Sequence, residues 1–509
     1  MSVHSVAAEV DGASEASREA LPQASGASRG ITRPRTRQST IVRAVAPFAI
    51  GGAVLLMPTP EGLTANAWHF FAVFLATITA IVTEPIPGAA AGLLGVFIAT
   101  VFGLVRPAPA QATAWALSGF SNSTVWLIFA AYMFACGYSK TGLGKRIALL
   151  LIRALGHRTL GLGYAVTFAD MALAPVTPSA TARSAGTIFP IVRSIPELYG
   201  SHPDDPSAKR IGSYLLYTAL AATMVTSSMF LTGLAPNTMA IALIAKAIGV
   251  TIPWMVWFKG FLPVGLILIL IQPALLYWLY PPEIKQAPEA PRWAAEQLRG
   301  MGPMTRQEMT MLALVIGALG FWIGGADFVD PAIVAGFVIL GMVIFGVVPW
   351  DDIVSHSQAW NTLIWFATLV TLAGGLAETK FLDWLAASMV PMLSGLGAYA
   401  TIAGIVLTFF FLHYFFASIT AHTATLFPLF LAVAVKIPVV TPVAWALLLA
   451  YPLGMIGVLT PYASGQNAVY YGSGFIKRKD FWVLGLILGV IYMAVYLTVI
   501  VKWLEYLGV

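Results

Sequence analysis

Apolar runs of about 20 residues, the length that crosses a bilayer as a helix, recur along this chain from residue 42 to its last residues. Transmembrane β-strands alternate polar and apolar residues and contain no such runs, so the crossing segments are helices. Charged residues make up 10% of the chain, whereas about 25% is usual in a soluble protein. The sequence therefore predicts an all-α polytopic membrane protein.

The apolar runs divide into two kinds. We predict eleven transmembrane helices, at 42–58, 66–84, 87–105, 123–141, 209–249, 254–280, 307–325, 331–349, 359–378, 440–472 and 480–506. Two further segments, 159–195 and 397–436, are too long for one span and carry polar and helix-breaking residues at their centres. We predict that each of these two folds as a re-entrant helical hairpin.

The basic residues predict the orientation. Of 28 Lys and Arg residues, Arg183 falls inside the membrane, and six fall on the side opposite to the rest: Arg106, Lys246, Lys259, Lys380, Lys436 and Lys502. Loops rich in Lys and Arg stay in the cytoplasm. We therefore expect a multi-pass protein of a bacterial-type inner membrane, with a cytoplasmic N-terminus and an outside C-terminus. Residues 1–41, rich in Ser, Ala and Arg without apolar periodicity, predict a disordered basic cytoplasmic tail.

Three pairs of segments resemble each other: 122–142 and 361–381, 179–183 and 421–425, and 231–237 and 459–467. They predict a first span at 42–65 followed by two repeats, 66–285 and 307–509, which a cytoplasmic linker at 286–306 connects. Each repeat holds five spans and one hairpin, and an odd number of spans inserts the second copy with inverted topology. Inverted repeats with interrupted helices in matching positions are typical of secondary transporters, which bind substrate where the interruptions meet.

The interruptions lie at the tips of the two hairpins and inside two broken spans, 209–249 near Gly233–Asn237 and 440–472 near Thr460–Gly465, and they carry donors suited to an anion. The N-terminus of a helix offers free N–H groups and the positive end of a dipole, and hydroxyl groups add further donors. Pro178 suits the start of the returning helix in the first hairpin. The predicted substrate-binding residues of the two hairpin tips and the two broken spans are Ser179, Ala180, Thr181, Gly233, Asn237, His422, Thr423, Thr460 and Pro461. The alternative is that small residues at these positions only let helices pack closely.

These residues also carry a resemblance that covers nearly the whole chain after residue 40. Residues 179–181 (Ser-Ala-Thr) and 421–423 (Ala-His-Thr) stand where the divalent-anion/sodium symporter family has Ser-Asn-Thr at each hairpin tip, and "TEPIP" (83–87) matches the family near the second span. "APVTPSATARSAGTIFPIVRSI" (174–195) is most similar to the branch of bacterial citrate, tartrate and succinate exchangers and plastid 2-oxoglutarate/malate translocators. The resemblance implies transport of di- or tricarboxylates by a homodimer, in which the hairpin-bearing part slides as an elevator against a fixed scaffold.

The motif asparagines are replaced here by Ala180 and His422. In sodium-coupled members those asparagines help form the ion sites, so their replacement predicts a sodium-independent antiporter without a cofactor. Arg183 and His422 add one side chain that can be cationic to each tip, and we predict that they compensate the charge of a dianion in place of sodium. A fixed cation would leave the empty site charged, so the carrier would return only when loaded.

Several alternatives stay open. Asp170 lies at a similar depth to Arg183 and could pair with it, which would make the arginine structural. A sodium-coupled symporter of the same fold and an inorganic-anion transporter are rival functions. A membrane-embedded enzyme is a further class, but no nucleophile constellation, phosphate loop or Cys/His cluster is evident. We therefore expect no enzyme, no metal site and no nucleic-acid partner.

Overall fold

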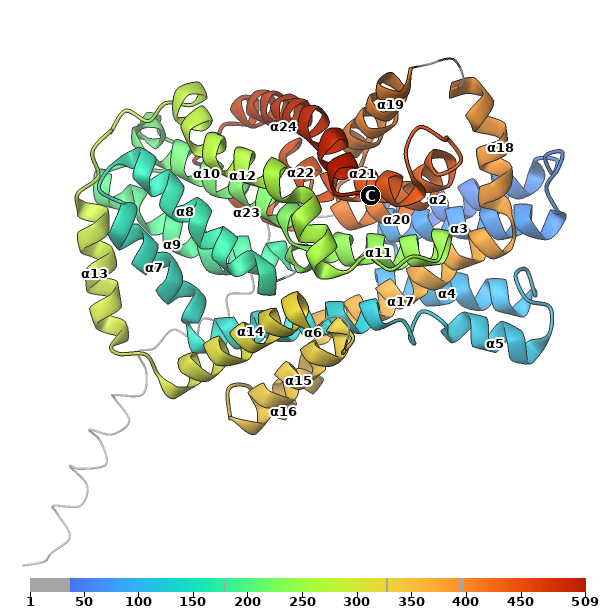
Figure 1. The fold of residues 1–509 in the computed structure, drawn as a ribbon, viewed down its shortest axis with the longest axis horizontal. Coiled ribbons are helices and arrows are strands. Elements are labelled where there is room, and N and C mark those ends of the chain that lie inside the picture. Colours follow the sequence, from blue (N-terminus) through green and yellow to red (C-terminus); the bar gives the residue numbers. More distant parts are fainter. Residues whose placement is uncertain (1–36, 178, 326–327, 394, 396) are drawn as a thin grey trace, which may run out of the picture.

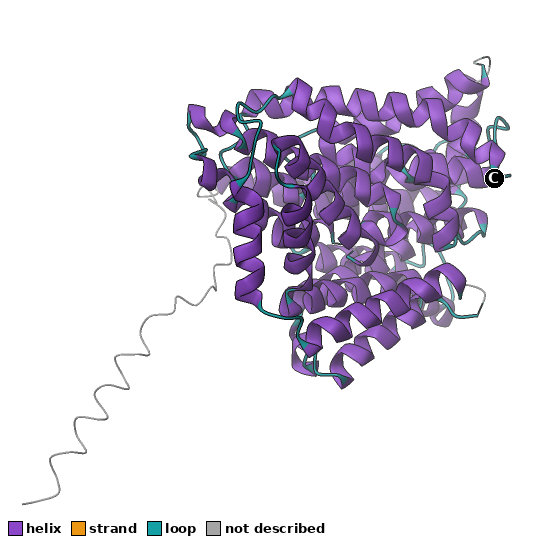
Figure 2. Cartoon of the chain, turned by 60° about the vertical axis from the view of Figure 1, so that its left-hand side comes forward, coloured by secondary structure: helices purple, strands orange, loops and turns teal. Residues whose placement is uncertain are grey.

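The computed structural model describes residues 37–177, 179–325, 328–393, 395 and 397–509. Within these residues the chain consists of helices joined by loops (Figure 2), and an isolated antiparallel bridge between Arg158 and Gln286 is its only β-type pairing. The all-helical prediction is thus confirmed. Residues 1–36 of the expected tail and Pro178 lie outside the described residues, and the first helix already begins at Arg37.

The helices up to residue 279 are shown from blue to yellow-green in Figure 1. Their bounds are α2 (Arg37–Leu56), α3 (Ala65–Thr83), α4 (Gly88–Val101), α5 (Pro109–Leu117), α6 (Ser123–Thr141), α7 (Leu143–Leu155), α8 (Thr159–Leu173), η1 (Ala174–Val176), η2 (Thr181–Ile188), α9 (Phe189–Ser194), η3 (Pro196–Tyr199), η4 (Pro206–Arg210), α10 (Gly212–Met229), η5 (Leu231–Gly233), α11 (Ala235–Ile248) and α12 (Trp254–Leu279). Here η2 is a π-helix and the other η elements are 3₁₀-helices.

The remaining helices run from yellow to red. Their bounds are α13 (Glu289–Met301), α14 (Arg306–Gly324), α15 (Pro331–Ile344), α16 (Trp350–Ser355), α17 (Ser357–Glu378), α18 (Phe381–Leu393), α19 (Ala398–Phe411), η6 (Leu412–Phe415), α20 (Ile419–Ala434), α21 (Pro442–Ala450), α22 (Pro452–Met455), η7 (Ile456–Val458), α23 (Gly465–Gly472) and α24 (Arg478–Tyr506). Several predicted spans match a helix closely, as 123–141 matches α6 and 254–280 matches α12.

Seven helical segments of the described residues are long and apolar enough to cross a membrane. They are Ala65–Thr83, Thr159–Val176, Trp254–Leu279, Arg306–Gly324, Ser357–Glu378, Ala398–Phe415 and Arg478–Tyr506, and shorter apolar helices accompany them. The membrane-protein class agrees with the prediction. The number of eleven spans and the re-entrant course of the two hairpins stay predictions.

Five helices occupy segments that the sequence analysis left between spans, namely α5, α7, α13, α16 and α18. Two of them, α7 and α13, are amphipathic, and α7 illustrates why a search for apolar runs misses such a helix. It buries Leu149 and Ile152 on one face, while Lys145 and Arg153 are exposed on another. Such an amphipathic helix has a clear apolar stripe but a low mean hydropathy.

Helix α10 lies in the interior of the protein and is buried along its whole length from Gly212 to Met229. It packs against α8, α12 and α22, and Figure 1 shows these four helices together. A helix that is covered on every side belongs to the interior of a large bundle. Helix α10 is therefore the interior helix beside which the neighbouring interruptions lie.

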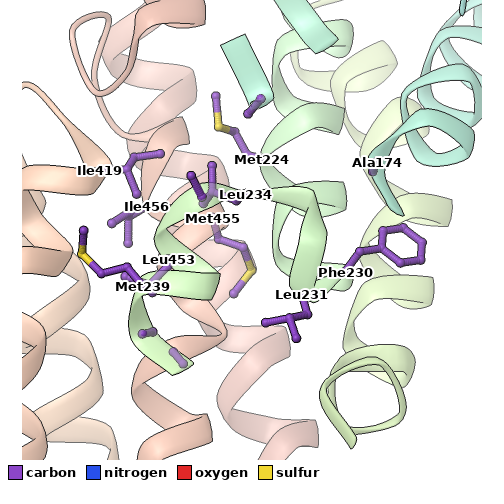
Figure 3. Packing of buried hydrophobic residues seen from close by; sticks show 14 of the residues in the cluster. Ala174, Met224, Phe230, Leu231, Leu234, Met239, Ile419, Leu453, Met455 and Ile456 are labelled. Atoms are coloured by element: carbon purple, nitrogen blue, oxygen red, sulfur yellow. The ribbon is translucent and has the colours of Figure 1, made fainter. Parts of the chain in front are cut away.

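Interruptions from distant parts of the sequence meet beside α10. Figure 3 shows Leu234, which follows η5, beside Met455 and Ile456 of α22 and η7, with Ile419 at the start of α20 close by. These residues belong to one buried apolar cluster that also includes Ala174 of η1 and Phe230. The apolar packing thus brings both hairpins and both broken segments into one region.

Candidate functional site

The two broken segments end and restart at the predicted positions. After α10 ends at Met229, η5 and the extended residue Leu234 lead to α11, in which Pro236 occupies the first turn. Proline suits this place because the first N–H groups of a helix have no partner within it. In the second segment, Thr460 and Pro461 lie in the loop between η7 and α23. The predicted interruptions at both places are therefore present.

An asparagine bridges each interruption in the same way. Asn237 Nδ2 donates to the carbonyl oxygens of Ser227 (2.7 Å) and Phe230 (3.1 Å). Asn467 Nδ2 donates to those of Gly457 (2.7 Å) and Thr460 (2.8 Å). In both cases the acceptors lie ten and seven residues earlier in the chain. Both asparagines are fully buried, and each ties the segment after its interruption to backbone carbonyl groups of the segment before it.

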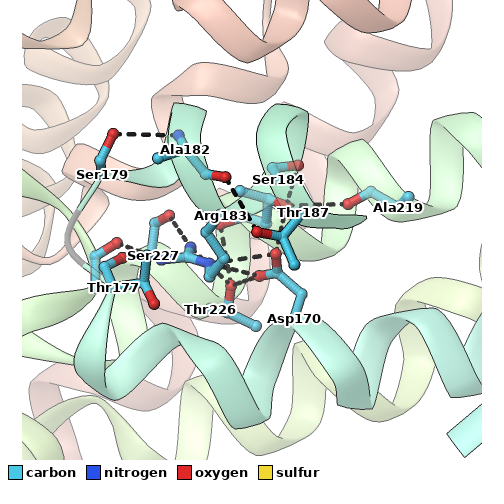
Figure 4. A network of polar contacts seen from close by, with 12 residues as sticks. Asp170, Thr177, Ser179, Ala182, Arg183, Ser184, Thr187, Ala219, Thr226 and Ser227 are labelled. Atoms are coloured by element: carbon cyan, nitrogen blue, oxygen red, sulfur yellow. Dashed lines mark hydrogen bonds and ion pairs between the residues drawn. The ribbon is translucent and has the colours of Figure 1, made fainter. Parts of the chain in front are cut away.

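Arg183 is fully buried and paired with Asp170, as Figure 4 shows. Its Nε lies 3.2 Å from both oxygens of the Asp170 carboxylate. Its two terminal nitrogens donate to four further oxygens: Thr177 O (2.7 Å), Gly233 O (2.8 Å), Thr226 Oγ1 (3.4 Å) and Ser227 Oγ (2.9 Å). All five N–H groups of the guanidinium are therefore engaged.

The hydroxyl groups of α10 complete the surroundings of Asp170. Its carboxylate accepts hydrogen bonds from Thr223 Oγ1 (3.0 Å) and from Thr226 Oγ1. The Thr223 hydroxyl also lies 2.8 Å from that of Ser184, which in turn lies 3.2 Å from the Tyr470 hydroxyl on α23. A buried ion pair is stable only when such additional hydrogen bonds satisfy its remaining polar atoms.

The ion pair is the arrangement that the sequence analysis gave as the alternative for Arg183. In this conformation the pair carries no net charge, and the guanidinium has no free N–H group for a carboxylate ligand. Arg183 instead joins the first hairpin, through Thr177 and Asp170, to the first interruption at Gly233. A role of Arg183 in charge compensation stays a prediction.

His422 differs from Arg183 in that it is surrounded by aromatic rings and not by hydrogen-bond acceptors. It is fully buried in the first turns of α20, and its ring packs against Phe409 (centroids 4.5 Å apart), Phe416 (5.3 Å) and His413 (5.2 Å). Among the described residues, neither ring nitrogen of His422 has a hydrogen-bond partner. The neighbouring Thr423 donates back to Ile419 O of its own helix (2.9 Å). A buried imidazole without a partner is uncommon, and the adjacent His413 shares this feature among the described residues.

Both hairpin tips contact the second interruption. Thr181 Oγ1 of the first tip lies 2.9 Å from Gln466 Oε1 at the start of α23. Tyr462 donates from its hydroxyl group to Tyr414 O of the second hairpin (2.9 Å). Thr460, in the loop before α23, is fully buried, and its hydroxyl group has no partner among the described residues.

The predicted site residues are thus close in space but unequal in exposure. Thr181 is exposed and Pro461 is partly exposed, whereas the other seven are buried: Ser179, Ala180, Gly233, Asn237, His422, Thr423 and Thr460. Ser179 caps the returning helix by accepting from the Ala182 N–H group (3.2 Å). Their role in binding substrate stays a prediction.

Polar residues that were not predicted complete this region, above all Gln466, Tyr470 and the hydroxyl residues Thr223, Thr226 and Ser227. The sequence contains a pattern from which the last three could have been predicted. The stretch "TMVTSS" (223–228) places hydroxyl groups at a spacing of three to four residues, which is one face of a helix.

Comparison with known families identifies the chain. The family model described as "Sodium:sulfate symporter transmembrane region" matches residues 38–509. The chain belongs to this family.

Two relatives in the family are similar along nearly their whole length. The chain is 44% identical over 474 residues to the "Citrate/succinate antiporter" of Escherichia coli (strain K12), and 43% identical over 474 residues to the "L-tartrate/succinate antiporter" of Shigella sonnei (strain Ss046). Each alignment covers 91% of this chain and 97% of the relative.

Solved structures of more distant transporters share the fold. The YdaH transporter of Alcanivorax borkumensis matches 78% of this chain and 89% of its own, with a TM-score of 0.54 and 14% identity. The Neisseria gonorrhoeae protein MtrF matches 87% of this chain and 96% of its own, with a TM-score of 0.52 and 14% identity. The chain therefore has a membrane-transporter fold.

Side chains typical of transition-metal sites are not grouped in the described part of this family member. No group of three or more His, Cys, Asp or Glu side chains lies close enough there to hold a metal ion. The expectation of sodium independence is a separate matter, since sodium sites consist of carbonyl and hydroxyl oxygens, and it stays a prediction.

Proposed function

We propose that this protein is an antiporter that exchanges di- and tricarboxylate anions of the citrate, succinate and tartrate type. The observation that carries the proposal is the 44% identity to a citrate/succinate antiporter over 91% of the chain. The convergence of four interruptions in a buried region supports it, because such interruptions form the substrate sites of secondary transporters.

We further propose that the chain consists of two inverted-topology repeats. The matching hydrogen bonds of Asn237 and Asn467 support this, and so does the matching order of helices. Helices α6 and α7 begin at residues 123 and 143, and α17 and α18 begin at 357 and 381, in each case just before a hairpin. Helix α7 also has its counterpart in α18, although neither is long and apolar enough to be predicted as a span.

An elevator movement within a homodimer is part of the proposal. The Arg183 network supports it by joining the first hairpin to the first interruption, through the bonds from Arg183 to Thr177 O and Gly233 O. The hydrogen bonds of Thr181 and Tyr462 join both hairpins to the second interruption. Elements joined in this way would move as one body against the rest of the protein.

His422 is the better candidate to face the charge of a substrate. The charge of Arg183 is matched by Asp170, whereas the ring nitrogens of His422 are free within the described structure. A neighbouring dianion favours the cationic form of a histidine. We therefore propose that charge compensation depends chiefly on His422, and that Arg183 positions the first tip.

Exchange in proteoliposomes tests the function. Liposomes loaded with unlabelled succinate should take up labelled citrate or succinate from a buffer without sodium, and liposomes without internal carboxylate should not. Uptake that requires sodium would favour the symporter alternative. Uptake that sulfate inhibits and that succinate does not affect would favour an inorganic-anion transporter. If neither citrate, succinate nor tartrate exchanged in any buffer, the proposed function would be wrong.

A further inference from the structure

A cavity of about 760 Å³ lies at the far ends of two helices that begin in the central region, α11 and α20. Its walls come from the ends of α11, α17 and α20 and from the beginnings of α18 and α21. None of the predicted substrate-binding residues lines it. It is therefore separate from the site described above.

Charged side chains dominate the polar lining of this cavity. Lys246, Lys380 and Lys436 line it together with Glu378 and Asp383. Lys436 lies 3.2 Å and Lys380 3.8 Å from the Asp383 carboxylate. Glu378 pairs with Arg106, whose NH2 lies 2.7 Å from its carboxylate. Four cations thus surround two carboxylates, which leaves an excess of two positive charges.

This cluster is unusual because of the side on which the positive-inside pattern places it. Only six Lys or Arg residues are predicted on the outer face, from which the positive-inside rule depletes basic residues. Four of the six gather around this one cavity, and they come from separate parts of the chain: the loop before α5, the last turn of α11, the α17–α18 junction and the end of α20.

Helix capping alone does not explain the cluster. Lysines near the carboxyl ends of helices stabilise them by about 0.3–1 kcal/mol, and α11, α17 and α20 all end here. That role needs no cavity, and it does not account for Arg106, which comes from the connection between α4 and α5. Lys246 also has no ion-pair partner among the described residues, so its charge is available to a ligand.

We propose that the cavity is a second anion-binding site, which collects doubly charged carboxylates at the outer face before transport. This inference rests on the proposed function. The ion pairs around Asp383 and Glu378 are a third or more exposed, and exposed pairs contribute only about 0–1 kcal/mol. A ligand can therefore replace Asp383 as the partner of Lys380 and Lys436 at little cost.

The position of the cavity suits such a role. Helices α11 and α20 pack side by side and connect it to the central region. Lys246 lies nine residues after Asn237 on α11, which corresponds to about 14 Å along the helix axis. A cluster of one sign of charge at the mouth of a binding region raises the local concentration of the opposite ion.

Kinetics from each side of the membrane test this site. The variant is Lys246→Gln, Lys380→Gln and Lys436→Gln combined. Lys259→Gln with Lys502→Gln is the control, because it removes charges from the same predicted face away from the cavity. Both are compared with the wild type in succinate-loaded right-side-out and inside-out vesicles. We expect the triple variant to raise the external KM for succinate about three- to tenfold at low ionic strength, with kcat unchanged. The difference should shrink in high salt, and inside-out vesicles and the control should show no change.

An unchanged external KM in the triple variant would overturn the inference, and so would an equal rise in the control. A fall in kcat without a change in KM would also overturn it, because that result indicates a structural role for the lysines. Proteoliposomes of zwitterionic lipid distinguish a carboxylate ligand from the headgroup of an anionic lipid, which would also be attracted by the positive charge. If the difference between wild type and variant required anionic lipid, the occupant would be a headgroup and the inference would be wrong. Exchange by the wild type in the same vesicles tests the proposed antiporter function separately. If the wild type shows no exchange, both the antiporter function and the second anion-binding site are wrong.

Discussion

Arg183 at the tip of the first hairpin and His422 at the tip of the second are both completely buried, but their surroundings are opposite. Arg183 uses all its donors on Asp170, on two hydroxyl groups and on two carbonyl oxygens. His422 lies among aromatic rings and uses neither of its nitrogens within the described structure. A buried cation with a complete set of partners stabilises one arrangement of the chain, whereas an unpartnered imidazole remains available for binding.

The hydrogen bonds at the two interruptions are more alike than the surroundings of Arg183 and His422 at the two tips. Asn237 and Asn467 make the same two bonds, but Asn467 Oδ1 also accepts from Ser464 Oγ (2.5 Å), and Asn237 Oδ1 has no partner among the described residues. The residue that corresponds to Ser464 before Asn237 is Leu234. The two halves thus share the same pair of asparagine-to-carbonyl hydrogen bonds. They differ in the polar side chains around the asparagine.

Removing one member of the Arg183–Asp170 pair should have the largest effect. Arg183→Met would leave the Asp170 carboxylate buried without a cation. Loss of one partner of a buried pair costs about 3–5 kcal/mol, so we expect little folded protein after size-exclusion chromatography and a strongly lowered melting temperature. Arg193→Met is the control, because Arg193 pairs with Glu197 at the surface (2.8 Å) and should change little.

The double variant Asp170→Asn, Arg183→Met makes the test specific to charge. It removes both charges, and we expect it to recover much of the folded protein that Arg183→Met loses. If Arg183 compensates the charge of a substrate, exchange stays absent in this folded double variant. Restored exchange would show that Arg183 acts only through its structural bonds.

The asparagine bridges should have a smaller effect that differs between the two halves. Asn467→Ala loses three side-chain hydrogen bonds and Asn237→Ala loses two. At about 1 kcal/mol for each bond, Asn467→Ala should melt at the lower temperature in a thermal unfolding assay. Ser464→Ala removes only the extra bond and should account for the difference. Equal melting temperatures of the two asparagine variants would contradict this account.

The sequence was informative where a pattern is local. Apolar runs predicted the helical class, and proline and glycine beside Asn237 and Thr460 predicted the interruptions. It could not decide between the two roles of Arg183, because Asp170, Thr226 and Gly233 come together only when the hairpin packs on α10. It also missed α7, whose apolar residues form a stripe rather than a run, and α18, which is apolar but too short to span a membrane. Long-range partners such as Gln466 for Thr181 have no local signal.

His422→Phe should have the smallest effect on stability. Phenylalanine has a similar shape and would pack against Phe409, Phe416 and His413, and the substitution removes no hydrogen bond of the described structure. It also removes two buried polar atoms without partners, whose desolvation costs free energy in the folded protein. We therefore expect an unchanged or slightly raised melting temperature.

Exchange should nevertheless be lost in His422→Phe if His422 faces the substrate, since the variant has no group that can become cationic at the second tip. His413→Phe is the matched control: it replaces the adjacent buried histidine, which does not stand at the position of the repeated hairpin motif, and it should keep exchange. A stable His422→Phe variant without exchange, beside an active His413→Phe variant, would assign the functional difference between the tips to one side chain. Exchange by His422→Phe at the wild-type rate would show that the second tip needs no cation, because the variant differs from the wild type only in the lost imidazole.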